Sequence, residues 1–308
     1  MYCFGVDIGG TTVKMGLFEG DGNLIDKWEI KTVVANGGEA ILPDVAESIA
    51  AKIKEHNVDK DQVVGVGVGV PAPVINDGIV KKTANLGWGY KNVSAELEAL
   101  TGFKVKVAND ANAAALGEMW KGGGRGNKNV VMVTLGTGVG GGVILNEKIL
   151  TGTNGAGGEI GHLTMEPDEE ESCGCGKKGC LEQYASATGI ARLARRTLAA
   201  TDKVTVLNAE TVTAKDVFDA VKAGDEVAIE VAVKFGKYLG YGLSSVAAIV
   251  DPEIFVIGGG VSKAGEILFD FIRQPYMDKA FFANEEVKFA LAQLGNDAGI
   301  YGAAKLVL

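Results

Sequence analysis

The chain has 308 residues, of which 47% are hydrophobic and 22% are charged, a composition that excludes an intrinsically disordered chain and allows about two domains. Its 30 basic and 39 acidic residues give a formal net charge of −9, which argues against nucleic acid as a main partner. Glycine is unusually frequent at 45 residues, roughly twice the ordinary share. We expect the excess in turns where the backbone closely approaches another group.

The first half of the chain begins with a predicted hairpin. Apolar residues alternate over residues 2–8, and the turn Gly9-Gly10-Thr11-Thr12 leads into a second strand that ends at Phe18. Helical spacing and short apolar runs predict the elements that follow. In chain order they are a helix over 39–57, buried strands over 63–70 and 105–108, and a helix over about 111–120.

The second half opens with a strand–turn–strand unit from Val130 that matches the first hairpin, with Gly136 in the place of Gly9. This repeat suggests two related halves. Ser262 and Asp297 are predicted to cap the helices that follow the last two strands. The mixture of strands and helices predicts the α/β class. The elements expected after the repeat are helices over 184–200, 213–222 and 225–250, and strands over 253–257 and 287–292.

Three glycine loops follow predicted strands, at residues 9–12, 136–142 and 258–260. Glycine lets backbone N–H groups approach a phosphate, and threonine adds a hydroxyl donor. The alternative for the first loop is a tight hairpin turn without a ligand. The sequence has no G-x-x-x-x-G-K-[ST] loop. Residues 136–141 match G-x-G-x-x-G, but a strand follows where a dinucleotide site requires a helix, which disfavours a nicotinamide cofactor.

Three cysteines lie close together in the sequence, and a histidine precedes them by eleven residues. Three thiolates and one imidazole complete the tetrahedron of a structural zinc site. Reduced buried cysteines or a redox pair are the alternatives. Four candidate ligands within nineteen residues favour zinc, whereas Cys3 and His56 are interpreted as a strand residue and a surface residue. The predicted zinc ligands are His162, Cys173, Cys175 and Cys180.

Acidic residues lie beside these motifs. Asn109-Asp110 falls where a strand gives way to a helix, so it is either a helix N-cap or a ligand-binding pair at a strand end. Glu159 lies three residues before His162, and Glu182 lies two residues after the last cysteine. Ionised carboxylates accept hydrogen bonds from several hydroxyls at once. The group therefore suits a sugar ligand.

With these residues the chain resembles the ROK family of bacterial sugar kinases, and within it the glucokinases, over essentially its whole length. The most specific part is Glu159-x-Gly161-His162 followed by Cys173-x-Cys175-Gly176-x-x-Gly179-Cys180-x-Glu182, which resembles the family's zinc and sugar signature. The glycine loops alone are shared with the wider actin-like ATPase superfamily. The other similar motifs are Val6–Thr12 and Leu135–Gly142 for phosphate, Asn109–Ala113 for catalysis and Ile257–Val261 for adenosine.

The resemblance implies an actin-like ATPase (ribonuclease H-like) fold, with two α/β lobes and a cleft between them. It places a small lobe at residues 1–118, joined by a C-terminal helix over 297–308. The large lobe would cover residues 119–296 and carry the zinc segment 159–182. The implied activity is ATP-dependent phosphorylation of glucose at its 6-hydroxyl, a glycolytic reaction that uses Mg²⁺.

The resemblance also implies a role for each matching residue. Asp110 would be the general base for the 6-hydroxyl, and Asp7 would help to hold Mg²⁺. The implied sugar contacts are Asn85, Asn109, Asp110, Glu159, His162 and Glu182. The implied nucleotide contacts are Gly9, Gly10, Thr11, Thr12, Lys14, Gly136, Thr137, Gly138, Gly258, Gly259 and Gly260.

Several alternatives stay open. N-acetylglucosamine, N-acetylmannosamine or fructose could replace glucose, and polyphosphate could replace ATP. Ala72 follows Pro71 where family members commonly have glycine, which adds a methyl group near the expected sugar pocket. A non-catalytic sugar-responsive ROK regulator is disfavoured because the chain enters its first strand by residue 2, where such regulators carry a helix-turn-helix. A zinc-dependent dehydrogenase is disfavoured by the strand after the glycine loop.

The expected setting follows from composition and from the resemblance. The sequence shows no targeting or membrane segment, so we expect a cytoplasmic protein with no membrane partner. The resemblance implies a homodimer or a dimer of dimers.

Overall fold

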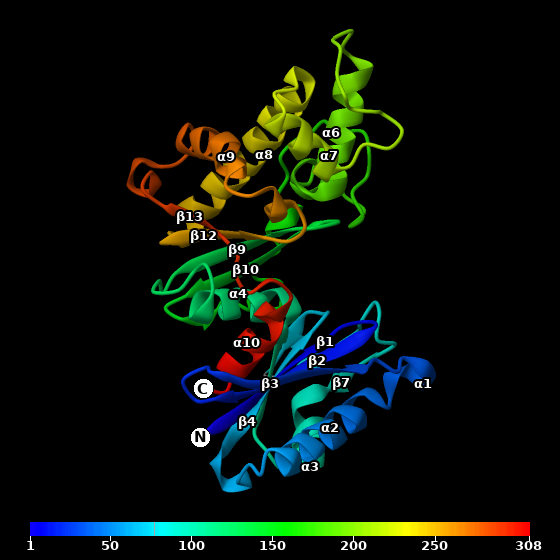
Figure 1. Cartoon of the computed structure of the whole chain (residues 1–308), viewed down its shortest axis with the longest axis vertical. Helices are drawn as coiled ribbons and strands as arrows, with labels where there is room; N and C mark the ends of the chain where they lie inside the picture. The colour runs from blue at the N-terminus through cyan, green and yellow to red at the C-terminus, as the bar shows by residue number, and fades with distance from the viewer. Residues whose placement is uncertain (77) are drawn as a thin grey trace. The chain divides into compact units, whose positions relative to one another are not determined.

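The computed structural model describes residues 1–76 and 78–308, and it divides into two compact units (Figure 1). The first unit comprises Met1–Lys128, Gly142–Gly158 and Gln293–Leu308. The second unit comprises Asn129–Gly141 and Glu159–Ala292. Each unit has its own β-sheet and its own helices, and each is described by itself below.

The first unit is built on a five-stranded sheet in the order β3-β2-β1-β4-β8. The predicted hairpin is confirmed, because β1 and β2 pair antiparallel around the turn at residues 9–11. β1, β4 and β8 run parallel to one another, so their carboxyl ends meet at one edge of the sheet. The strands are β1 (Tyr2–Ile8), β2 (Thr12–Glu19), β3 (Leu24–Lys31), β4 (Val63–Val70) and β8 (Val105–Asn109).

Helices cover both faces of this sheet. On one face α2 (Ile41–Glu55) and α3 (Val93–Thr101) contribute to the core that contains Phe4 and Val6 of β1. On the other face α10 (Ala298–Lys305) packs against Cys3 of β1, next to α4 (Asp110–Lys121). Apolar spacing predicts α2 and α4 within two residues of their observed ends.

Glycine allows α10 to approach the sheet closely. A Cβ at Gly5 of β1 would collide with the carbonyl of Ile300, and a Cβ at Gly67 of β4 would collide with the carbonyl of Ala303. On the helix side, a Cβ at Gly302 would collide with the carbonyl of Ala113 in α4. The expectation that the glycine excess lies in turns is therefore only partly right, because several glycines lie at helix–sheet and helix–helix contacts.

The smaller elements of the first unit have no clear signal in the sequence. A three-stranded sheet in the order β5-β6-β7 is made of strands of two residues each, which are too short for a periodic pattern. The remaining elements are α1 (Ala35–Gly38), η1 (Lys60–Gln62), β5 (Val74–Ile75), β6 (Ile79–Val80), β7 (Lys91–Asn92), β11 (Lys148–Ile149) and η5 (Gly295–Asp297).

The second sheet has the order β11-β10-β9-β12-β13, in which β12 is parallel to both β9 and β13. This order corresponds strand for strand to that of the first sheet, as the sequence repeat suggested. β10 (Val139–Leu145) carries the chain from the second unit into the first. The other strands of the second unit are β9 (Val130–Leu135), β12 (Ile254–Gly258) and β13 (Lys288–Leu291).

The helices predicted over 213–222 and 225–250 are observed within two residues of those bounds. The single helix predicted over 184–200 is two helices, because the backbone is extended at Ser186, which caps the second of them. No helix among the described residues is long and apolar enough to cross a bilayer. The helical elements are η2 (Ile160–His162), α5 (Glu182–Ala185), α6 (Ala187–Ala199), α7 (Ala214–Lys222), α8 (Glu226–Val250), η3 (Val261–Ala264), α9 (Ile267–Met277) and η4 (Phe282–Asn284).

Two predicted helix caps are wrong. Ser262 lies inside η3, its hydroxyl donates to the carbonyl of Gly259, and α9 begins only at Ile267. Asp297 stands at the N-cap position of α10, but its carboxylate accepts from Lys27 Nζ at 2.7 Å and caps none of the described backbone N–H groups. In both places a partner outside the helix takes the polar side chain.

Candidate active site

Two carboxylates lie at the carboxyl edge of the first sheet. Asp7 is near the end of β1, and Asp110 follows β8 as the first residue of α4. Gly69 of β4 lies between them, because a Cβ at this position would be 3.6 Å from Asp7 Oδ1 and 3.8 Å from Asp110 Cα. Ligands of open α/β sheets bind at this edge. The predicted base and the predicted magnesium ligand are therefore neighbours in the first unit.

The environment of Asp7 disfavours its negative charge. Burial, and to a smaller extent the charge of Asp110, raise the pKa of Asp7 to about 6, against the opposite effect of the charge of Lys14. Lys14 is the cross-strand partner of Asp7, and its Nζ donates to the carbonyl of Asn296 at 3.2 Å. A divalent cation beside Asp7 would offset the cost of burying the carboxylate.

Asn109 both caps α4 and orients Asp110. Its Oδ1 accepts from the backbone N–H groups of Ala111 at 3.0 Å and Asn112 at 3.2 Å. Its Nδ2 donates to Asp110 Oδ1 at 2.9 Å and to the carbonyl of Ala72 at 3.4 Å. The N-cap interpretation of Asn109 is thus confirmed. The same amide fixes the position of the carboxylate that is predicted to act as the base.

The first glycine loop is a tight hairpin turn that lies beside Asn85. The N–H of Gly9 donates to the carbonyl of Thr12 at 3.0 Å, and Thr32 Oγ1 donates to the carbonyl of Gly9 at 2.7 Å. A Cβ at Gly10 would be 3.2 Å from Cβ of Asn85. The predicted sugar contact Asn85 therefore lies against the loop that is predicted to hold phosphate.

In the second unit, one atom from each of the four predicted zinc ligands lies within 4.8 Å of the others. Cys175 Sγ and Cys180 Sγ are 3.7 Å apart. A tetrahedral zinc with Zn–S bonds of about 2.3 Å separates its sulfur ligands by about 3.8 Å. The Cys₃His cluster, made of His162, Cys173, Cys175 and Cys180, therefore fits a tetrahedral metal ion.

Backbone pairing brings the histidine to the cysteines. An isolated bridge pairs Thr164 with Cys180, and the N–H of Leu181 donates to the carbonyl of Leu163 at 2.8 Å. Gly179 has φ of +71°, and a Cβ there would collide with the carbonyl of Glu166. Burial raises the pKa of the Cys173 thiol to about 12. A bound cation would stabilise the thiolate form that metal coordination requires.

Glu182 connects the cysteine segment to the second glycine loop. Its Oε2 accepts from the N–H of Val139 at 3.0 Å, and its Oε1 lies 3.3 Å from Cys173 Sγ. Any side chain at Gly138 would collide with this carboxylate. Glu159 Oε2 lies 3.9 Å from His162 Nε2. The predicted sugar ligands of the second unit thus adjoin the Cys₃His cluster.

Two residues were predicted to stand apart from the site. Cys3 is fully buried in β1 and packs in the core, as expected of a strand residue. His56 follows α2, and its Nε2 lies 2.9 Å from Asp26 Oδ2. Both residues make contacts within the first unit, Cys3 in its core and His56 with Asp26.

Comparison with known proteins decides between the predicted classes. The sequence matches the profile of the ROK family over residues 3–308. This chain belongs to the ROK family. It is 44% identical to a glucokinase of Halalkalibacterium halodurans over 98% of this chain and 94% of that protein.

Solved ROK structures share the fold. The chain is similar to a ROK hexokinase from Thermus thermophilus, with a TM-score of 0.82, 32% identity, and coverage of 99% of this chain and 97% of the other. It is also similar to a ROK family glucokinase from Streptomyces griseus in complex with glucose and AMPPNP, with a TM-score of 0.73, 33% identity and 99% coverage of both chains. The predicted α/β class and the two-lobed actin-like ATPase fold of ROK kinases are confirmed.

The ROK chain has a pocket beside its third glycine loop that the sequence motifs mark only in part. The cavity has a volume of about 340 Å³, and Gly260 lines it together with residues of α7 and η3. Phe218 contributes an apolar wall, and Lys215 and Lys222 contribute charge. The α7 sequence predicts an amphipathic helix but carries no binding motif, so sequence reasoning missed these lining residues.

Proposed function

We propose that this ROK protein is an ATP-dependent glucokinase, which transfers the γ-phosphoryl group of ATP to the 6-hydroxyl of glucose. The observation that carries the proposal is the position of Asp110 at the end of β8, held by Asn109 and next to Asp7 at the same sheet edge. The 44% identical relative, a glucokinase, supports glucose as the acceptor. The neighbouring glucokinase structure with AMPPNP supports ATP as the donor.

In this proposal Asp110 accepts the proton of the 6-hydroxyl as that oxygen attacks the γ-phosphorus. The amide of Asn109 keeps the carboxylate in position, because its Nδ2 donates to Asp110 Oδ1. Phosphoryl transfer depends mainly on positioning and on stabilising charge. Asp7 would hold Mg²⁺, which neutralises charge on the phosphates when it is bound.

The glycine loops and the pocket beside Gly260 are assigned to the nucleotide. The loops at 9–12 and 136–138 would donate backbone N–H groups to phosphate oxygens, together with Lys14. The pocket along α7 would hold adenosine, since it combines the apolar wall of Phe218 with the backbone of Gly260. Gly258 and Gly259 precede this pocket at the end of β12.

We assign structural zinc to the Cys₃His cluster and sugar binding to the residues around it. Zinc would fix His162 and the cysteine segment, and through Cys173 it would fix Glu182. Glu159, His162 and Glu182, with Asn85 and Asn109 of the first unit, would then accept or donate hydrogen bonds to the sugar hydroxyls. A closed zinc site of this kind stabilises a fold and takes no part in the chemistry.

Three further assignments come from the resemblance. We propose lobes at 1–118 with 297–308 and at 119–296, a homodimer or dimer of dimers, and a cytoplasmic setting.

A second candidate is kinase activity on a different hexose. Ala72 is only 5% exposed, and its carbonyl lies 3.4 Å from Nδ2 of Asn109, a proposed sugar contact. Ala72 therefore lies next to a proposed sugar contact, at a position where glycine is common in the family. N-acetylglucosamine, N-acetylmannosamine and fructose are the competing acceptors.

ADP release from Mg-ATP tests the proposal with each sugar supplied alone. Strong preference for glucose over mannose, fructose, N-acetylglucosamine and N-acetylmannosamine is expected. Preference for an acetylated sugar would keep the mechanism and change the substrate. Sugar binding without ADP release would overturn the kinase assignment and favour a regulatory role. Polyphosphate in place of ATP tests the donor in the same assay.

A further inference from the structure

Glu118 is a buried acidic residue that the proposed chemistry does not use. It lies in the last turn of α4, and its side chain is fully buried. Burial of a charge is costly, and the negative end of the helix dipole adds to the cost at this place. Among the described residues, the hydrogen-bond partners of the carboxylate are all backbone N–H groups. These donors therefore stabilise its charge.

The donors come from two segments that are far apart in the chain. Glu118 Oε2 accepts from the N–H of Gly123 at 2.8 Å, and Oε1 accepts from the N–H of Leu294 at 2.8 Å. The N–H of Gln293 lies 3.1 Å from Oε1 and 3.0 Å from Oε2, so it bonds to both oxygens. One side chain thus joins the segment that follows α4 to a segment near the C-terminus.

Both segments belong to connections between the two units. The chain leaves the first unit after Lys128 and returns to it at Gln293, and these are two of the four points where it passes from one unit to the other. The return is abrupt. The N–H of Ala292 donates to the carbonyl of Ile257 in the second unit at 2.9 Å, whereas the N–H of Gln293 donates to Glu118 in the first unit. The change of unit therefore falls on a single peptide unit.

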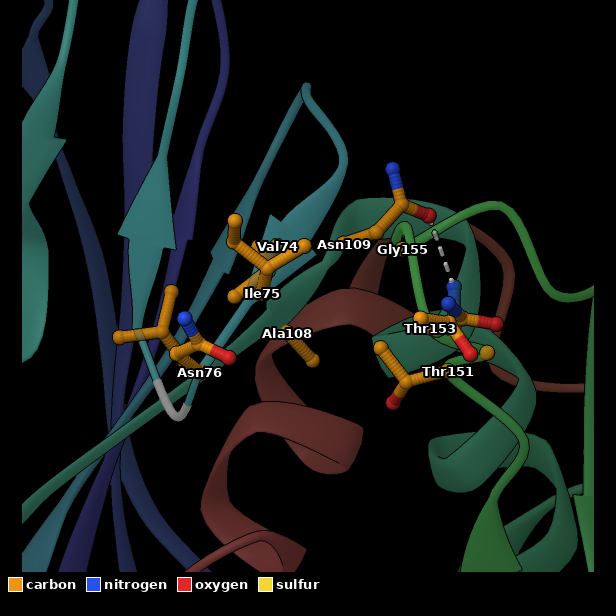
Figure 2. A pocket seen from close by; sticks show the side chains of 11 residues that line it. Val74, Ile75, Asn76, Ala108, Asn109, Thr151, Thr153 and Gly155 are labelled. Carbon is orange, nitrogen blue, oxygen red and sulfur yellow. Dashed lines mark hydrogen bonds between the residues drawn. The ribbon is translucent and has the colours of Figure 1, made fainter.

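Two helices connect Glu118 to the proposed active site. Asp110, the proposed base, is the first residue of α4, and eight residues of helix place it about 12 Å from Glu118 along the axis. Asn109 caps the same end of the helix and lines a cavity of about 380 Å³ (Figure 2). Leu294 precedes η5 and α10, the helix that passes Asp7. The bonds of Glu118 therefore fix one end of the helix that carries Asp110 and the start of the segment that covers Asp7.

A carboxylate is suited to hold both connections, and an amide is not. Glutamine has the same length, but only its carbonyl oxygen accepts hydrogen bonds, and its NH₂ group donates them. Whichever way the amide turns, the NH₂ group faces an N–H donor, that of Gly123 or that of Leu294. Glu118→Gln therefore releases one connection and keeps the other without a change of size.

We propose that Glu118 is a positioning residue for phosphoryl transfer, because it anchors two connections between the units at one point of the first unit. At these connections only residues 124–128 and the peptide unit between Ala292 and Gln293 are left to absorb a change between the units. The link to catalysis rests on the proposed function, in which groups of both units bind each substrate. Small misplacements of reacting groups slow a reaction strongly, so a released connection affects the chemistry although Glu118 belongs to neither proposed binding site.

Steady-state kinetics of full-length Glu118→Gln, with glucose and Mg-ATP varied in turn, test the link to catalysis. We expect kcat to fall by at least about tenfold and KM for both substrates to rise by at least about threefold, because hinge residues change both parameters together. Loss of folded protein lowers kcat alone, since KM does not depend on the concentration of active enzyme. Wild-type KM values in the variant would therefore overturn the proposal.

Glu98→Gln is the matched control. Glu98 lies in α3 of the same unit, and its Oε1 also accepts from a backbone N–H, that of Val105 at 2.9 Å. Its described hydrogen bonds involve neither connection. This variant should keep the wild-type kcat and both KM values, and changes equal to those of Glu118→Gln would overturn the proposal.

Hydrogen exchange followed by mass spectrometry tests the anchor itself and does not depend on kinase activity. In the wild-type protein the N–H groups of Gln293 and Leu294 should exchange slowly, and Glu118→Gln should speed exchange at least about tenfold at Leu294 or at Gly123. Exchange of these groups in the wild type as fast as in an exposed loop would overturn the proposal, even if the variant does not fold. Absence of ADP release from the wild type would refute the glucokinase assignment alone, and the exchange rates would still decide on the anchor.

Discussion

Replacement of Asp7 by asparagine should make the ligand-free protein more stable at neutral and alkaline pH while removing a proposed magnesium ligand. Burial and the neighbouring Asp110 raise the pKa of Asp7 from 3.8 to about 6. At about 1.36 kcal/mol for each unit of pKa, the ionised carboxylate costs up to about 3 kcal/mol in the folded protein. Asparagine has a similar shape and no charge, so Asp7→Asn should recover much of this free energy.

The sign of the pH dependence follows from proton binding. Between about pH 4 and pH 6 the folded state keeps the Asp7 proton and the unfolded chain loses it. Unfolding therefore releases a proton, and this carboxyl makes the free energy of unfolding fall as pH rises through that window. The advantage of Asp7→Asn should be largest above about pH 6 and should shrink towards about pH 4.

Urea unfolding followed by tryptophan fluorescence measures this effect in the relevant unit. The three tryptophans, Trp28, Trp88 and Trp120, all belong to the first unit. Asp270→Asn changes an exposed aspartate of the second unit and should shift the free energy of unfolding by less than about 0.5 kcal/mol. A stability difference for Asp7→Asn that does not vary with pH, or a variant less stable than wild type at about pH 8, would refute the electrostatic reasoning.

Three further predictions concern catalysis, metal binding and stability. Asp110→Asn should keep glucose affinity in calorimetry but lose at least about 10²-fold in turnover, the scale of general-base catalysis, and near-normal turnover would remove Asp110 from that role. Cys175→Ala should lose zinc in metal analysis and bind glucose more weakly, whereas stoichiometric zinc with unchanged affinity would contradict the structural-zinc assignment. Glu169 is buried and paired with Arg192 and Arg196, which hold the pKa of its carboxyl well below its usual range. Glu169→Gln should lower the free energy of unfolding by about 3 kcal/mol at neutral pH, as expected when a buried ion pair is broken. The difference between the two proteins should disappear in acid, where the wild-type carboxylate is protonated. Equal thermal unfolding of the two proteins at neutral pH would refute this prediction.

Some elements could be predicted from the sequence because their signal lies within the element itself. The strand over 63–70 has its observed bounds because its apolar run is continuous and ends at Pro71. The Cys₃His cluster was predictable from spacing alone, because Cys173, Cys175 and Cys180 lie on one short loop. The repeat was visible because both halves begin with the same strand–turn–strand pattern.

Other features depend on contacts that sequence spacing does not carry. The Asp297 carboxylate pairs with Lys27, which lies 270 residues away in the chain, so a rule for local caps could not anticipate it. The strands β5 to β7 have two residues each, and they are defined only by their pairing with one another. The pocket beside Gly260 needs α7, whose residues the motifs do not mark. These features follow from the tertiary fold.

Glycine residues around Asp7 contribute to its raised pKa, and the raised pKa bears on its proposed role. α10 lies close to β1 and β4 because Gly5 and Gly67 leave no side chain in its path. At the start of this helix a Cβ at Gly299 would lie 2.5 Å from Asp7 Oδ2, so glycine is also needed for the helix to pass the carboxylate. The close approach buries Asp7, and burial is the largest cause of its raised pKa. A bound cation stabilises the ionised form of a buried carboxyl and so offsets the free-energy cost of its charge. This is the interaction proposed between Asp7 and Mg²⁺.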